Sequence, residues 1–163
     1  IDNEMVVLMR RIVFLIFSFI FFLNASENYT FLVKEYSKEI ELEAKIISNI
    51  AQNLKLGNDK IFLYIPEISE TEKNIYSGFF NIANTCSEAD FVFVKNEKTS
   101  NQPCSGNKKI FFTNNYDSLL KNKQFIGAFF WSKSRPNIVF VKNRLVENNI
   151  ELPEIYNKFI EEF

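Results

Sequence analysis

Glu67, Glu70 and Glu72 stand close together directly after a short apolar run. The run, residues 61–65, is typical of a strand buried on both faces of a sheet. Carboxylates at the carboxyl end of such a strand lie where open α/β sheets bind ligands, so the cluster could form a carboxylate or metal site. The alternative is structural. Ser69 and Glu72 have the spacing of a capping box, and acidic groups stabilise the start of the helix that would follow. The capping-box spacing favours this second interpretation.

Four further candidates surround a polar turn in the last third of the chain: Trp131, Lys133, Arg135 and Pro136. Tryptophan and arginine are among the residues that most often anchor protein interfaces, and a guanidinium beside an aromatic ring also suits recognition of an anion. The alternative is a solvated turn in which Pro136 only sets the backbone geometry. We identify these four residues as the candidate partner-binding group.

Cys86 and Cys104 are the two cysteines of the chain, so a single intramolecular pairing exists. In an oxidising compartment such a pair forms a disulfide, whereas in a reducing one it would remain as two free thiols. The spacing is not that of a C-x-x-C redox motif. Because the leader described below indicates export, we predict a Cys86–Cys104 disulfide.

Several function classes are disfavoured by composition. Histidine is absent, which removes the commonest general base and metal ligand. The four glycines are scattered, so they build no phosphate-binding loop. The net charge of −1 argues against nucleic-acid and anionic-membrane partners, which require a basic stripe. We therefore predict a protein that is not an enzyme, that uses no metal or cofactor, and that binds no nucleic acid.

The start of the chain has the zones of a secretory signal peptide. Arg10 and Arg11 precede an apolar run at residues 12–23, and small and polar residues follow around Ala25. The run has 12 residues, whereas a membrane-spanning helix needs roughly 20, so a retained anchor is the weaker alternative.

We therefore expect residues 1–25 to be a cleaved signal peptide and residues 26–163 to form one periplasmic domain with no membrane span after cleavage. The chain opens without Met, and a start at Met9 would give a leader that begins Met-Arg-Arg. We attribute residues 1–8 to the choice of start site and leave them out of the fold argument.

The elements that must position the candidate residues alternate between helical and apolar extended patterns. Apolar residues recur at helical spacing over residues 29–56, which predicts a long N-terminal helix. A second helix should open at Ser69, with an apolar face that reaches Cys86, and shorter ones should begin near Asn115, Arg144 and Pro153. Continuous apolar runs predict five strands, at residues 61–65, 91–94, 110–112, 125–131 and 138–141.

This alternation predicts a single layered α/β domain with a mostly parallel sheet of about five strands and helices on both faces. The last two strands are separated only by the polar turn at residues 132–136, so they should form a C-terminal hairpin that adds one antiparallel edge.

The segment that contains this turn also carries a family resemblance. Residues 127–140, GAFFWSKSRPNIVF, followed by a helix at Leu145 and by Leu152-Pro153, resemble a segment of small exported proteins and periplasmic sensor domains of Campylobacter-like bacteria. Within that group the chain looks like the periplasmic accessory proteins of the Campylobacter flagellar motor, which build scaffold rings around the rotor and stators. The resemblance implies a periplasmic location, a scaffold role in motility, and envelope or flagellar motor proteins as partners.

Two functions remain as hypotheses. The first is a structural or scaffold protein that binds other envelope proteins. The second is a small-molecule sensing domain, similar to half of a bilobal solute-binding protein. The long first helix and the turn around Trp131 and Arg135 offer docking surfaces, which favours the first. A deep pocket lined by convergent polar groups would favour the second.

Overall fold

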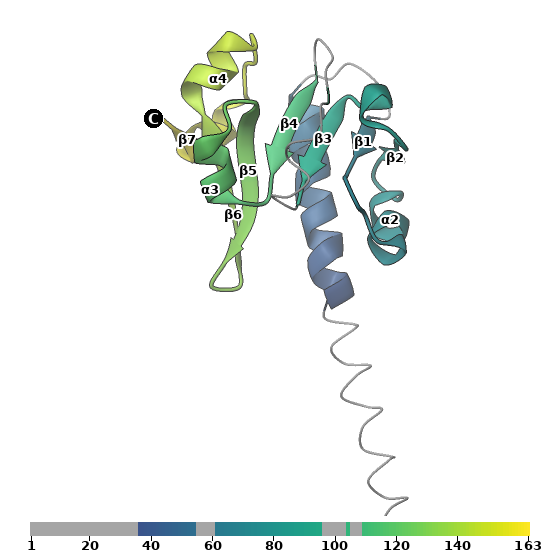
Figure 1. Ribbon diagram of the computed structural model, residues 1–163. Coiled ribbons are helices and arrows are strands. Elements are labelled where there is room, and N and C mark those ends of the chain that lie inside the picture. The colour runs from purple at the N-terminus through teal and green to yellow at the C-terminus, as the bar shows by residue number, and fades with distance from the viewer. Residues whose placement is uncertain (1–35, 55–60, 96–103, 105–108) are drawn as a thin grey trace, which may run out of the picture. The chain divides into compact units, whose positions relative to one another are not determined.

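The computed structural model describes residues 36–54, 61–95, 104 and 109–163 (Figure 1). The predicted signal peptide and its cleavage site at Ala25 lie outside the described residues. The chain divides into two units, residues 1–39 and residues 40–163, and the fold below is that of the second unit. Across the described ranges, no helix has the length and apolar character that crossing a membrane requires.

One seven-stranded sheet forms the centre of this unit, in the order β2-β1-β3-β4-β5-β6-β7. Neighbouring strands are parallel except for β5 and β6, which form an antiparallel hairpin. The strands are β1 (Phe62–Tyr64), β2 (Asn81–Ile82), β3 (Phe91–Val94), β4 (Ile110–Thr113), β5 (Phe125–Ser132), β6 (Arg135–Val141) and β7 (Ile160–Glu161). The predicted α/β fold with a mostly parallel sheet is therefore confirmed.

Two details of the predicted sheet are wrong. We expected about five strands, and the structure adds β2 and β7, each of two residues. We also expected the hairpin to form the edge of the sheet, but β7 pairs in parallel with Phe140 and Val141 of β6. Among the residues that the structure describes, the outer edge of β6 is therefore unpaired only in the part of the strand near the turn.

Helices and 3₁₀ turns connect the strands. Residues 36–53 are helical, and they are called here the first helix. The other elements are α2 (Glu70–Tyr76), α3 (Tyr116–Lys121), α4 (Lys142–Glu147) and the 3₁₀ helices η1 (Cys86–Glu88) and η3 (Glu154–Phe159). The capping box at Ser69 is confirmed, because its hydroxyl accepts from the Glu72 backbone and the Glu72 carboxylate accepts from the Ser69 backbone.

The prediction that this second helix extends to Cys86 is wrong. It ends at Tyr76 because the chain beyond it joins the sheet as β2. The backbone N–H of Asn81 donates to the Ile61 carbonyl at 3.0 Å, and that of Ala83 donates to the Leu63 carbonyl at 2.8 Å. The hydrogen bonds to β1 therefore determine the conformation of this segment, although the spacing of its apolar side chains favours a helix.

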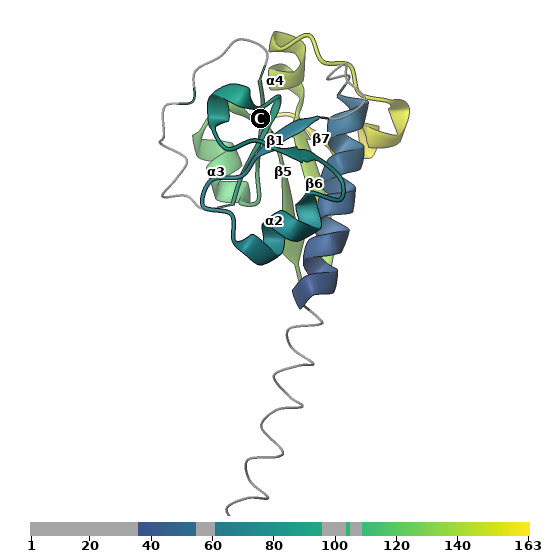
Figure 2. The same ribbon diagram turned by 90° about the vertical axis from the view of Figure 1, so that its right-hand side faces the viewer.

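The sheet carries a separate core on each face. On one face, the first helix and α2 pack side chains such as Ile47 and Tyr76 against the strands. On the other face, α3 contributes Leu119 to a smaller cluster that includes Val92 and Ala128. Helices on opposite sides of the sheet are also visible when the molecule is turned (Figure 2).

Gly127 fixes how closely β5 approaches its neighbours. A Cβ atom there would lie 2.4 Å from Cε2 of Phe112 and 2.6 Å from the carbonyl oxygen of Val139. Phe112 is fully buried and the carbonyl belongs to β6, so neither atom has room to move away. Glycine at this position therefore allows the base of the hairpin to pack tightly against β4.

Candidate functional site

The sheet contains the type of position where doubly wound folds bind ligands. The first five strands follow the order 2-1-3-4-5, and the direction of strand addition reverses between β1 and β3. In such sheets the carboxyl ends of the two strands at the reversal form the usual binding crevice. Here, the carboxyl end of β1 leads into the predicted glutamate cluster, and the carboxyl end of β3 is followed directly by Lys95.

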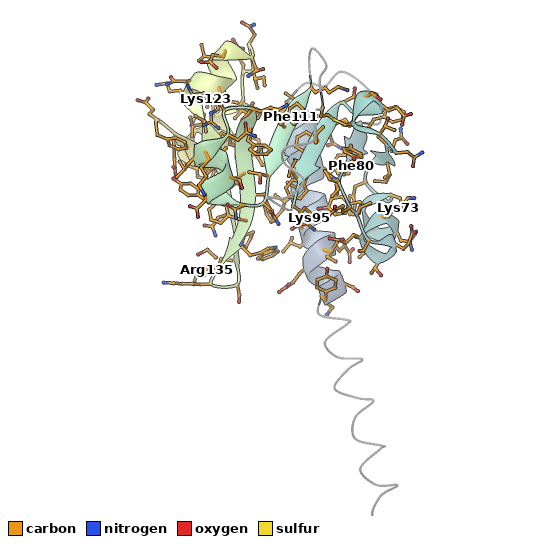
Figure 3. The ribbon with its side chains drawn as sticks, viewed as in Figure 1. Lys73, Phe80, Lys95, Phe111, Lys123 and Arg135 are labelled. Atoms are coloured by element: carbon orange, nitrogen blue, oxygen red, sulfur yellow. A yellow bond between two sulfur atoms is a disulfide. The ribbon has the colours of Figure 1, made fainter. Side chains whose placement is uncertain are left out.

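Lys95 is the centre of an ion-pair network at this position (Figure 3). Its Nζ atom lies 2.6 Å from Oε1 of Glu43, on the first helix, and 2.6 Å from Oε1 of Glu72, on α2. The Tyr76 hydroxyl donates to the same Glu43 oxygen at 2.6 Å. The Lys95 ammonium also lies 5.8 Å from the centre of the Tyr76 ring. Four side chains from three elements thus form one polar cluster, which we call the Lys95 network.

Burial and the ion pairs act in opposite directions on the pKa values of Glu72 and Lys95. By itself burial would raise the pKa of Glu72, but hydrogen bonds from Lys95 and Ser69 outweigh it, and the pKa is lowered. Burial would lower the pKa of Lys95, but the attraction and hydrogen bonds of Glu43 and Glu72 outweigh it, and the pKa is raised. Burial and the neighbouring Glu43 carboxylate raise the pKa of Tyr76, so its hydroxyl stays a donor.

The network bears on the two interpretations of the glutamate cluster. Glu72 belongs both to the capping box of α2 and to the Lys95 network, which agrees with a structural role. Glu67 and Glu70 are exposed, and within the described residues no group of three or more acidic or cysteine side chains is placed to hold a metal ion. The carboxylate or metal site gains no support from this arrangement.

Glu43 and Lys95 were not among the residues that the sequence singled out. A signal for Glu43 was present, because it lies three residues after Ile40 and four before Ile47 on the apolar stripe of the first helix. A charged residue on a buried stripe needs a partner, and Glu43 is only 5% exposed. The partner itself, 52 residues further along, has no local sequence signal.

The four predicted partner-binding residues come together on the β5–β6 hairpin. Lys133 and Ser134 form its two-residue turn with φ angles of 50° and 58°, the left-handed pair of a type I′ turn. Lys133, Arg135 and Pro136 are exposed, and Trp131 is half-buried. Figure 3 shows Arg135 beside the turn, with its side chain directed away from the sheet.

Trp131 and Pro136 form a cross-strand pair at the base of this turn. The Trp131 ring stands edge-on to Phe129, with the ring centres 5.7 Å apart, and packs against the larger core. Ser132 and Arg135 close the turn, so the next pair, Trp131 and Pro136, is not hydrogen-bonded across the hairpin. The missing N–H of Pro136 therefore faces the outer edge of β6, where it breaks no sheet bond.

The predicted cysteine pair lies at disulfide distance, with the two Cα atoms 5.8 Å apart. Cys86 lies in η1 rather than at the end of the second helix, where the sequence placed it. A second interaction holds the same turn. The Lys109 ammonium donates to the carbonyl oxygens of Cys86, Ser87 and Ala89 at 2.9, 2.7 and 2.9 Å.

The geometry therefore separates a buried, internally paired network from an exposed basic hairpin. No protein-family model, curated protein or solved structure gives a significant match to the chain. The case for a function accordingly rests on these two sites.

Proposed function

We propose that this chain is a non-enzymatic periplasmic scaffold protein that binds other envelope proteins through the β5–β6 hairpin. The observation that carries the proposal is the composition of the hairpin end. Two exposed cations, Lys133 and Arg135, stand beside an exposed Pro136 and a half-buried Trp131. Neither cation has a carboxylate within ion-pair distance in the described part of the chain, so both charges are available to a partner.

The hairpin would dock through its side chains rather than by accepting an extra strand. Strand addition requires a row of free backbone N–H groups along an edge. Near the turn, Pro136 contributes none, and the alternation of pairing leaves only the Ile138 N–H directed outward before β7 begins. Proline on an edge strand is a common protection against pairing with another chain.

A periplasmic location is supported by the predicted leader and by the cysteine pair at disulfide distance. The sequence resemblance to accessory proteins of the flagellar motor extends the proposal to a partner class, namely components of that motor.

The second hypothesis, a small-molecule sensing domain, would place its ligand at the carboxyl ends of β1 and β3. There the Lys95 ammonium is already paired with Glu43 and Glu72. A ligand would have to displace one of these carboxylates from a largely buried position. The internal pairing therefore supports protein docking over small-molecule binding.

The substitution Arg135→Glu tests the proposal. A buried aromatic–arginine anchor contributes about 2 kcal/mol or more to an interface, whereas a solvated turn residue contributes close to zero. We expect the variant to keep the thermal stability of the wild type and to lose its partners in affinity purification from the native envelope. If those partners belong to the flagellar motor, swimming should also suffer.

The matched control is Lys123→Glu, another charge reversal at an exposed position on the surface. It should retain the partners. Co-purification of Arg135→Glu at wild-type levels would reject the hairpin as the docking site, and the exposed side of the first helix would be the next surface to test.

A further inference from the structure

The two ends of the β6 strand lead toward segments of opposite charge. At the second end, Lys142 and Arg144 come first, and both are engaged within the chain, Lys142 with Glu162 and Arg144 with the carbonyl oxygens of Leu119 and Phe125. Residues 129–139, around the hairpin turn, contain Lys133 and Arg135 and no acidic residue. Residues 146–155, beyond the other end of the strand, contain three exposed glutamates and no basic residue. We call these segments the basic end and the acidic end; the glutamates of the latter are Glu147, Glu151 and Glu154.

The strand keeps these ends apart. The strand β6 has seven residues, which at about 3.3 Å each separates its ends by about 20 Å. Its last residue, Val141, leads directly into α4, where the acidic end begins. Figures 1 and 2 agree that α4 lies at the end of the sheet opposite to the hairpin turn. The two segments of one copy therefore cannot neutralise each other.

Both ends also present apolar surface. In the acidic end, Val146 is 69% exposed and Ile155 is 71% exposed, the highest values among the large apolar side chains that the structure describes. In the basic end, the Trp131 ring is half-buried and Pro136 is exposed. The two ends are therefore complementary. Each presents apolar side chains, and the carboxylates of the acidic end are opposite in charge to the two cations of the basic end.

We propose that a second copy of this chain is a partner of the hairpin, with the basic end of one copy bound to the acidic end of the next. This inference rests on the proposed function, because it uses the same hairpin side chains. The contact joins two different surfaces, the basic end of one copy and the acidic end of another. Because every copy carries both surfaces, copies associate head to tail. The apolar side chains supply contact area, and the charges set the orientation.

Sedimentation velocity of the purified protein over a range of concentrations tests the proposal. The weight-average sedimentation coefficient should rise with protein concentration. It should fall toward the monomer value in about 1 M salt, where charges are screened beyond roughly 3 Å. Lys133→Glu/Arg135→Glu and Glu151→Lys/Glu154→Lys should each weaken association by about tenfold or more.

A chain that carries both pairs of substitutions separates specific pairing from a general effect of charge. Its ends have exchanged signs, so association should return toward the wild-type level. The control Lys45→Glu reverses one exposed charge on the first helix and should change nothing. Failure of the doubly exchanged chain to associate would overturn the proposal, as would a wild-type protein that stays monomeric at every concentration.

These results are distinguishable from failure of the proposed function. A monomeric wild type whose Arg135→Glu variant still loses its envelope partners would mean that the hairpin binds a different acidic protein. That outcome overturns self-association and leaves the docking role of the hairpin in place. Retention of all envelope partners by Arg135→Glu would instead reject the proposed function.

Discussion

Lys95 and Arg135 are both cations at the end of a strand, but they differ in burial and in ion pairing. Lys95 follows β3, its side chain is 20% exposed, and two carboxylates lie 2.6 Å from its ammonium group. Arg135 opens β6, is exposed, and has no carboxylate within 4 Å among the described residues. The two regions place the same type of charge in two different environments within one small fold.

Burial is the physical reason for the difference. A charge removed from water requires compensation by a partner, so the Lys95 network joins the first helix, α2 and β3 in a fixed arrangement. A charge that remains in water needs no partner inside its own chain and contributes little to stability. Removal of Lys95 should therefore damage the fold, and removal of Arg135 should damage only binding.

The largest effect is expected from Lys95→Met. The substitution leaves the buried Glu43 carboxylate without its cation, and breaking a buried pair in this way costs about 3–5 kcal/mol. Urea unfolding measures the loss directly. The control Lys133→Met removes an exposed cation at the hairpin turn and should stay within about 0.5 kcal/mol of the wild type.

A double variant sharpens the same test. Glu43→Leu/Lys95→Met replaces both charges with apolar groups and should recover much of the lost stability, because no uncompensated charge then remains in the core. If Lys95→Met alone lowers the free energy of unfolding by less than about 1 kcal/mol, the network does not hold the three elements together. The proposed difference in stability between the Lys95 network and the hairpin would then be rejected.

Within the hairpin itself, alanine substitutions at the base and at the turn should have different effects on stability. At the base, Gly127→Ala would place its Cβ against the Phe112 ring and the Val139 carbonyl, so overpacking should cost about 2–3 kcal/mol. At the turn, Ser134→Ala adds no such contact and should have a much smaller effect on the free energy of unfolding. Equal effects at the two positions would show that the base is not tightly packed.

The pH dependence of stability should follow the Lys95 network. Glu72 has a lowered pKa in the fold, so its contribution is complete above its ordinary value of 4.5 and is lost as pH falls through the lowered value. Lys95 has a raised pKa, so its contribution is complete below its ordinary value of 10.5 and is lost as pH rises through the raised value. Urea midpoints should therefore decline at both extremes.

The same pH series measured on two variants shows which residues cause the decline of the urea midpoint. Lys95→Met should flatten both limbs, whereas Arg135→Glu should run parallel to the wild type because Arg135 has no partner in the described fold. A Lys95→Met profile with the wild-type shape would mean that other groups control the pH dependence.

The smallest effect, and a favourable one, is expected from Ser134→Gly. Ser134 has a φ angle of 58°, a conformation that costs most residues about 1–2 kcal/mol and glycine almost nothing. Glycine also gives the unfolded chain more freedom, so the net gain should be about 0.5–1 kcal/mol in urea unfolding. A loss of stability would indicate that the Ser134 side chain makes a contact that the turn needs.

The sequence predicted the parts of the fold that rest on local patterns. The apolar run at residues 91–94 became β3 without change, and the helix predicted to begin near Asn115 is α3, which Asn115 caps through its side-chain oxygen. By contrast, the strands β2 and β7 have two residues each and exist only because partner strands lie beside them. No periodicity is readable in two residues, so both strands were missed.

The candidate sites divide in the same way. Trp131, Lys133, Arg135 and Pro136 are neighbours in sequence, so a hairpin turn was enough to bring them together. Glu43 and Lys95 are 52 residues apart and meet only after the first helix has packed on the sheet. Contacts of this kind depend on the tertiary structure, which local spacing does not encode.

The ammonium group of Lys109 has a consequence for the kinetics of oxidation. It holds η1, and with it Cys86, through three carbonyl oxygens that do not depend on the redox state of the cysteines. Cys104 precedes Lys109 by five residues, which span at most about 18 Å of chain. After reduction the two thiols would therefore face each other at an effective concentration of millimolar or above. A fold that has already formed should reoxidise quickly, without waiting for one cysteine to search for the other.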